Sequence, residues 1–108
     1  MESRIVELEK RIVQSLCSDL EAFVFHEDLI DPSMVNNFIR RHSLGEILIL
    51  KSIGKGVYVL LFDERKIDSS CLYGRCGSLK SIEREICVAK CRRREINTLK
   101  TKLLKMLE

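Results

Sequence analysis

Apolar residues in the last third of the chain recur at alternating steps of three and four positions. This spacing is typical of the seam of a coiled coil, and it predicts one long helix over residues 78–108. Arg93 and Lys100 interrupt the seam, which consists of Leu79, Ile82, Ile86, Ala89, Ile96, Leu103 and Leu107. A helix of that length would span about 45 Å, too far for the other 77 residues to cover. We therefore expect part of the seam to form a dimer interface or to pack against another partner.

The beginning of the chain shows the same helical period. The pattern predicts a helix over residues 3–17, for which Ser3 is a suitable cap. Its apolar face consists of Ile5, Leu8, Ile12, Val13 and Leu16, and its other face is rich in glutamate.

A second helix is expected over residues 19–28. Ser18 and Glu21 have the spacing of a capping box, in which a serine and a glutamate three residues later satisfy the first backbone amides of a helix. The alternative is a strand over residues 22–25, because aromatic and β-branched residues favour sheets. We favour the helix because of the box.

The middle of the chain predicts a helix followed by a hairpin. Asp31 and Pro32 suit the start of a helix, and residues 42–45 end it. Two strands are then expected, over 46–51 and 56–63, joined by a turn at 52–56 that contains glycine. Residues 64–70 are polar and are interpreted as a loop, and 71–77 as a short irregular or extended link into the long helix.

These elements predict an α+β fold: a small helical domain with a β-hairpin wing, residues 1–77, followed by the long C-terminal helix, 78–108. A chain of 108 residues suffices for one domain with an appendage. Its apolar runs are too short to span a bilayer, and its first residues do not resemble a signal peptide. We expect a soluble intracellular protein, cytoplasmic or nuclear, that does not bind a membrane.

The net charge of +3 hides a gradient along the chain. Residues 1–31 contain three basic and eight acidic residues. Residues 32–66 contain six basic and three acidic residues, and residues 67–108 contain ten basic and five acidic residues. This asymmetry indicates either an anionic partner or pairing between the acidic and the basic parts of the chain.

The order helix, helix, helix, hairpin, long helix resembles a winged helix-turn-helix domain, over residues 3–66, with a C-terminal dimerisation helix. The resemblance rests on element order and on the helix after Asp31 that leads directly into the hairpin. It implies that this helix enters the major groove of DNA and that the hairpin touches the backbone. Groove contacts would then come from Ser33, Asn36, Asn37, Arg40 and Arg41, and phosphate contacts from Lys51 and Lys55. The alternative is an ordinary solvated helix face with two routine hairpin lysines.

A basic cluster in the long helix offers a second contact for phosphates. It contains Lys90, Arg92, Arg93 and Arg94, with Lys100, Lys102 and Lys105 beyond. An exposed helix rich in arginine can lie along a phosphate backbone. The alternative, which we favour for this cluster, is that these residues keep a coiled coil soluble or pair with the acidic first helix.

Four of the five cysteines cluster in the sequence: Cys71, Cys76, Cys87 and Cys91. They can be small buried apolar residues, one or two disulfides, or a tetrahedral zinc site. We favour buried residues over disulfides, and disulfides over metal, because the first pair is spaced more widely than in most zinc sites. Cys17, near the end of the first helix, is expected in the core.

Catalysis finds little support in the sequence. There are two histidines, His26 and His42, and no cysteine lies close to either of them in sequence. Residues 52–56 lack the spacing of a phosphate loop. We interpret the chain as a small dimeric DNA-binding regulatory protein without catalytic activity or cofactor. The alternatives are a scaffold subunit that docks through its C-terminal helix in a larger assembly, and a module stabilised by zinc.

Overall fold

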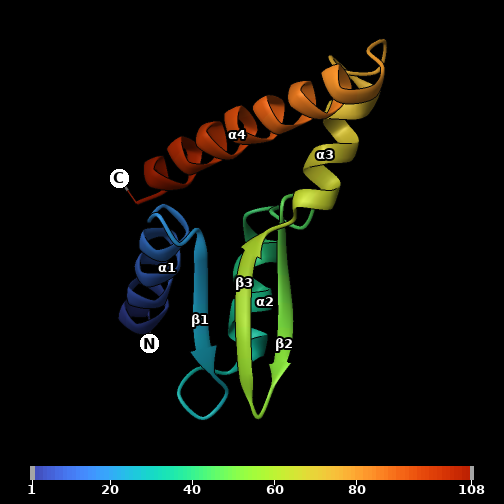
Figure 1. Cartoon of the computed structure of the whole chain (residues 1–108). Coiled ribbons are helices and arrows are strands. Elements are labelled where there is room, and N and C mark those ends of the chain that lie inside the picture. The colour runs from blue at the N-terminus through green and yellow to red at the C-terminus, as the bar shows by residue number, and fades with distance from the viewer. Residues whose placement is uncertain (1, 108) are drawn as a thin grey trace.

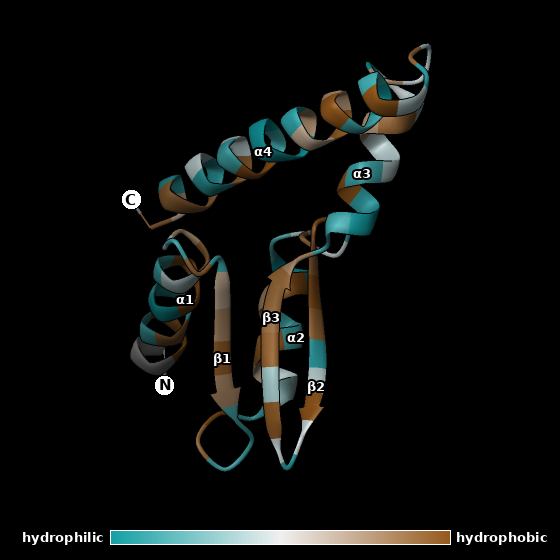
Figure 2. Ribbon diagram, in the orientation of Figure 1, coloured by the Kyte–Doolittle hydropathy of each residue, from teal (hydrophilic) through white to brown (hydrophobic). Residues whose placement is uncertain are grey.

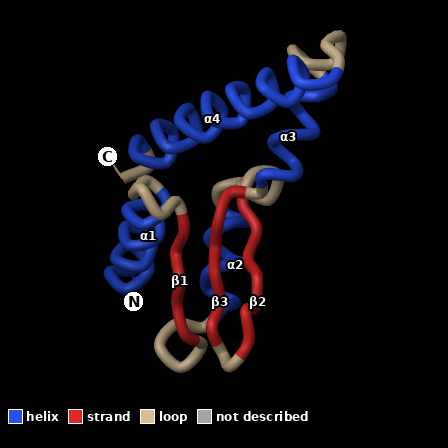
Figure 3. Tube along the Cα trace, viewed as in Figure 1, coloured by secondary structure: helices blue, strands red, loops and turns tan. Residues whose placement is uncertain are grey.

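The computed structural model describes residues 2–107, and side chains from Ile5 to Leu107. Within these residues the chain is an α+β protein with four helices and one small sheet, of which one helix lies behind the sheet and no helix covers its front face (Figures 1 and 3). In chain order the elements are α1 (Glu2–Leu16), β1 (Ala22–His26), α2 (Pro32–Arg41), β2 (Leu48–Gly54), β3 (Val57–Phe62), α3 (Glu64–Tyr73) and α4 (Ser81–Lys105).

The sheet is antiparallel, with strand order β1-β3-β2, so that the last strand lies in the centre. Its inner face carries Phe23, Leu60 and Leu48, all buried. They belong to one core cluster with the apolar faces of α1 and α2. Figure 1 shows α2 behind the sheet and α1 beside β1. The predicted first helix, third helix and hairpin are confirmed, with boundaries that shift by a few residues. The predicted cap at Ser3 lies outside the described side chains.

The predicted second helix over residues 19–28 is wrong, because β1 occupies Ala22–His26. Phe23 and Phe25 point into the core and Val24 is exposed, which is the alternation of a strand. The capping box does not form. Ser18 donates its hydroxyl to the carbonyl of Ser15 (2.6 Å), and Glu21 adopts a positive φ of 53°.

The predicted loop at 64–70 is also wrong, because this stretch lies in α3, which also takes the first three residues of the predicted link. Asp63 caps the helix by accepting a hydrogen bond from the backbone amide of Lys66 (3.3 Å). Ile67 and Cys71, one turn apart, are its buried residues. Two apolar positions are too few for a recognisable helical period, and the remaining polar residues are also typical of a loop.

The long helix is confirmed as α4, although it begins at Ser81 rather than residue 78. It runs from the end of α3 to the end of α1 across one edge of the molecule (Figure 1). In Figure 2 the sheet is mostly brown, whereas α4 alternates between brown and teal, as expected for an amphipathic helix. Ile96 and Leu103 join the core cluster and are 3% and 1% exposed.

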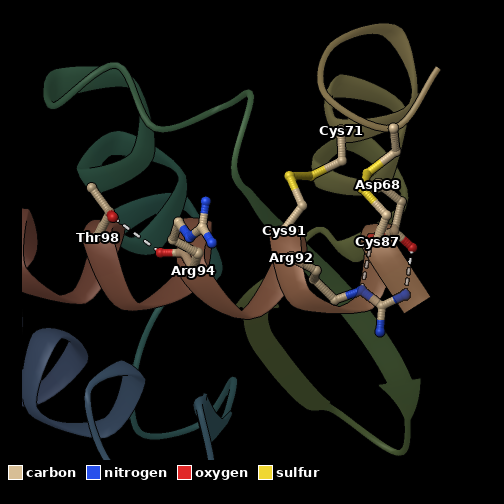
Figure 4. The surroundings of a disulfide bond; sticks show 8 residues. Asp68, Cys71, Cys87, Cys91, Arg92, Arg94 and Thr98 are labelled. Atoms are coloured by element: carbon tan, nitrogen blue, oxygen red, sulfur yellow. Dashed lines mark hydrogen bonds and ion pairs between the residues drawn. A yellow bond between two sulfur atoms is a disulfide. The ribbon is translucent and has the colours of Figure 1, made fainter. Parts of the chain in front are cut away.

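Two disulfides join α3 and the following loop to α4: Cys71–Cys91 and Cys76–Cys87 (Figure 4). The preferred interpretation, four reduced cysteines that act as buried apolar residues, is therefore wrong. Between residues 71 and 91, all of which the structure describes, the buried residues are Val88 and the cysteines 71, 76 and 91. We call residues 71–91 the α3–α4 tip. It has almost no apolar core besides its cysteines, so the two disulfides hold it together. Cys17 is free, half-buried and packed against the core.

Replacing both Cys76 and Cys87 by serine should destabilise the protein. A disulfide restricts the unfolded chain, and one that closes a loop this short contributes about 2–4 kcal/mol. We expect a loss of that size in the free energy of unfolding, measured by denaturant titration without reductant.

The matched control is Cys17→Ser, which keeps a donor for the carbonyl of Lys100 that Cys17 contacts (3.5 Å). It should change the free energy of unfolding by less than about 1 kcal/mol, since it breaks no cross-link. Equal stability of the wild type with and without reductant would contradict the assigned role of the disulfides.

Candidate nucleic-acid interface

The outer face of α2 is polar and carries no carboxylate. Asp31 caps the helix by accepting from the amide of Ser33 (2.9 Å), and Pro32 occupies its first turn. Val35 and Phe38 are buried, which turns the opposite side of the helix to solvent. The exposed residues on that side are those predicted for the groove: Ser33, Asn36, Asn37, Arg40 and Arg41.

The two arginines of α2 differ in their surroundings. Arg40 donates to the side-chain oxygen of Asn37 (3.0 Å), which orients both groups on the exposed face. Arg41 pairs with Glu9 of α1 (2.7 Å), and His42 contacts the same carboxylate oxygen (3.1 Å). Arg41 therefore has a carboxylate partner within the fold, whereas the charge of Arg40 faces solvent.

The hairpin tip is tied to the end of β1. His26 Nδ1 accepts from the amide of Asp28 (3.0 Å), so its Nε2 carries the proton and donates to the carbonyl of Lys55 (3.1 Å). Lys55 has a φ of 56° between two glycines, and its side chain is exposed at the turn. A side chain in place of Gly56 would meet the ring of His26 at 2.9 Å. The tip is thus a defined turn that presents one lysine.

Lys51 is placed differently from Lys55. It is exposed on β2 and pairs in register with Val59, whereas the neighbouring Leu50 pairs with the buried Leu60. Since side chains alternate along a strand, Lys51 projects from the face of the sheet opposite to α2. The structure brings together the five predicted residues of α2 but does not place Lys51 beside them.

The three adjacent arginines of α4 have three different environments. Arg92 donates twice to Asp68 of α3, both at 2.7 Å, in the geometry that guanidinium and carboxylate groups prefer (Figure 4). Arg93 pairs with Glu21, and Arg94 is exposed. Of the three predicted phosphate contacts, Arg92 and Arg93 thus hold α4 to the domain.

Glu21 explains the two interruptions of the apolar seam. Its carboxylate binds both Arg93 and Lys100, the latter at 2.6 Å. The side chain of Glu21 is only 22% exposed, although the group is charged. Hydrogen bonds from Arg93, followed by those from Lys100, lower the pKa of this carboxyl below its ordinary value. Arg93 and Lys100 therefore lie in the seam because an anion of the turn before β1 faces them.

The seam divides into two halves in the structure. Ile96 and Leu103 are buried in the chain's own core, and Leu107 packs against it. Ile82 and Ile86 are 67% and 51% exposed, Ala89 is exposed, and Leu79 is half-buried. The half of the seam that a second chain could cover is therefore the N-terminal half of α4.

The cysteines predicted as a low-probability zinc site are the four that form the disulfides. Among the side chains that the structure describes, from Ile5 to Leu107, no group of three or more histidine, cysteine, aspartate or glutamate residues is arranged to hold a metal ion. In the same part of the chain, no helix combines the length and apolar character needed to cross a membrane.

Comparisons of the chain with models of protein families, with curated proteins and with solved structures found no match.

Sequence reasoning missed the anionic partners that fix α4, Glu21 and Asp68. Glu21 was assigned to a cap and Asp68 to a loop, because neither pairing is local: the partners lie 72 and 24 residues away. The one available signal was the presence of two cations, Arg93 and Lys100, at seam positions. Such an interruption indicates that a buried or half-buried anion faces the helix.

Replacing Glu21 by glutamine should destabilise the protein in a pH-dependent way. Because the folded pKa of Glu21 is lowered, its contribution is complete above the unfolded pKa, about 4.3, and is lost as pH falls through the folded pKa. We expect a loss of about 1 kcal/mol at pH 7, and a difference from the wild type that shrinks as the pH falls below about 4. Denaturant titrations across this pH range would measure it.

The control is Glu7→Gln, an exposed carboxylate on α1. It should unfold as the wild type does at each pH. Equal stability of Glu21→Gln and the wild type at pH 7 would show that the ion pairs do not hold α4.

Proposed function

We propose that the protein is a small, non-catalytic DNA-binding protein of winged-helix type that acts as a dimer. The observation that carries the proposal is the outer face of α2. It presents Asn36, Asn37 and Arg40 to solvent on a helix without a single carboxylate. In a chain with 16 acidic residues, a surface helix that carries two arginines and no carboxylate favours an anionic ligand.

The side chains of this face suit the reading of bases. Asparagine can make two hydrogen bonds to adenine, and arginine two to guanine, in the major groove. Arg40 is the better candidate for a base contact, because Arg41 is paired with Glu9. Lys55 lies at the hairpin tip, near the end of β1 from which the chain enters α2, and we assign it a phosphate contact.

The fold departs from a helix-turn-helix in one respect. A strand, β1, stands where the second helix of such a domain would be, and α1 is the helix that pairs with α2 through Glu9 and Arg41. The proposal therefore assigns groove insertion to α2, with α1 and the hairpin as its supports.

Replacing Arg40 by alanine should weaken DNA binding and relax sequence preference. Loss of one paired contact to a base costs about 1–3 kcal/mol, or roughly a factor of 10 to 100 in affinity. We would first select preferred duplexes from a random pool with the wild-type protein. Fluorescence anisotropy titrations of the variant against the selected and an unrelated duplex would follow.

The matched control is Arg65→Ala, which removes one exposed arginine from α3. It should leave the ratio between the two affinities unchanged. If Arg40→Ala also leaves that ratio unchanged, α2 does not read the bases. If the wild type binds no duplex at low salt, DNA binding itself is refuted.

A second candidate function is that of a scaffold subunit, and the exposed seam favours it. Ile82 and Ile86 project from the α3–α4 tip, beside a groove of about 480 Å³ that Leu79 and Ile86 help to line. Exposed aliphatic side chains at helical spacing are the usual anchors for a second helix. The same surface would form the interface of the proposed dimer. The two functions therefore differ in whether a second copy of this chain or a different protein binds there.

Replacing Ile86 by glutamate should dissociate the proposed dimer without unfolding the chain, because this side chain is half exposed in the monomer. Light scattering should give twice the chain mass for the wild type and the chain mass for the variant. The control is Ile53→Glu in the hairpin, an isoleucine that is 60% exposed. A monomeric wild type at high concentration would refute the dimer and favour the scaffold function.

A further inference from the structure

The face of α4 that points away from the domain carries a continuous polar stripe. Its positions follow the spacing of one helical face, and all are exposed. We call this the outer stripe; it consists of Lys90, Arg94, Asn97, Thr98, Thr101 and Lys105. It lies opposite Ile96 and Leu103, which are buried against the domain. Between its first and last residue the helix rises about 22 Å.

The cations of the outer stripe form no ion pair among the described side chains. The neighbouring Arg92 and Arg93 are paired with Asp68 and Glu21, whereas neither Lys90 nor Arg94 has a carboxylate partner among residues 5–107. The one glutamate in this part of α4, Glu95, faces the side of Ile67 and Leu99 instead. Glu83 lines the same groove as Lys90 and Arg94 but forms an ion pair with neither. The stripe is therefore a row of exposed cations with one carboxylate near its N-terminal end.

The donors of the stripe can be sorted by availability. Thr98 and Thr101 donate their hydroxyls to carbonyls one turn earlier in the helix, at 3.0 and 3.1 Å (Figure 4 shows the first). The donors free for a ligand are the cations and Asn97. Arg75, from the loop after α3, extends the set, because it lines the same groove as Lys90 and Arg94.

We propose that the outer stripe binds the phosphate backbone of a nucleic acid, as a second contact distinct from α2. Lysine, arginine and asparagine side chains are common donors to phosphates, and such contacts fix position without reading sequence. A lipid surface fits less well, since a helix that lies on a membrane inserts its apolar face. In α4 that face is occupied by the domain over Ile96 and Leu103. The inference rests on the proposed function, and it adds the surface on which non-specific affinity depends.

The test compares two double variants with the same loss of charge. The first, Lys90→Ala with Arg94→Ala, removes two cations of the stripe. The second, Lys10→Ala with Arg65→Ala, removes two exposed cations from α1 and α3. Both are assayed by fluorescence anisotropy against a duplex of unrelated sequence at several salt concentrations, after circular dichroism has shown that they are folded. Vesicles rich in phosphatidylserine serve as a second probe.

Each phosphate that a protein cation neutralises releases counterions. It contributes about 0.9 to the magnitude of the slope of log affinity against log salt. The stripe variant should therefore show a slope that is shallower by about 2 and an affinity at least about tenfold lower at roughly 100 mM salt. The control variant should retain most of the wild-type affinity and most of the wild-type salt slope.

Three results would overturn the inference. If the wild type binds the duplex and the two double variants behave alike, the stripe makes no phosphate contact, and the proposed function of α2 is unaffected. If the wild type binds no duplex even at low salt, the proposed function fails and the inference with it. If the wild type binds vesicles and not the duplex, the ligand is a lipid surface.

Discussion

The attachment of α4 to the rest of the molecule is the interaction on which the architecture depends. Along its C-terminal half, Ile96 and Leu103 enter the core while Glu21 binds the two cations beside them. Along its N-terminal half, attachment is covalent, through two disulfides to α3 and its loop. Apolar burial and the ion pairs to Glu21 thus secure the C-terminal half of the helix. The cross-links, together with the ion pair between Arg92 and Asp68, secure the N-terminal half, where little apolar surface is buried. The exposed isoleucines and the outer stripe owe their positions to this arrangement.

Periodic elements with many apolar residues could be predicted from the sequence, and elements stabilised from a distance could not. The first helix, α2, the hairpin and α4 each carry enough buried positions to show their period. The prediction of a helix at β1 is wrong because Ser18 and Glu21 have the spacing of a local cap. In the structure Glu21 instead binds residues more than 70 positions away. The helix α3 was missed because its stability comes from Asp63, Asp68 and Cys71 rather than from an apolar face.

The candidate site shows the same limit. The exposed residues of α2 follow from a helix whose apolar face is evident, so they could be chosen from the sequence. The division of the basic residues of α4 could not, because Arg92, Arg93 and Arg94 look equivalent until their partners are known. Ion pairs across the fold decide which cations anchor the helix and which remain available to a ligand.

The two disulfides also determine what a protease could achieve at the α3–α4 tip. Both bridges enclose the exposed loop that precedes α4, since Cys76 and Cys87 lie on either side of it. A single backbone cut within that loop would therefore leave the two fragments covalently joined, and α4 would stay in place. Only reduction would separate them. This exposed connection could therefore be cut without releasing α4 from the molecule.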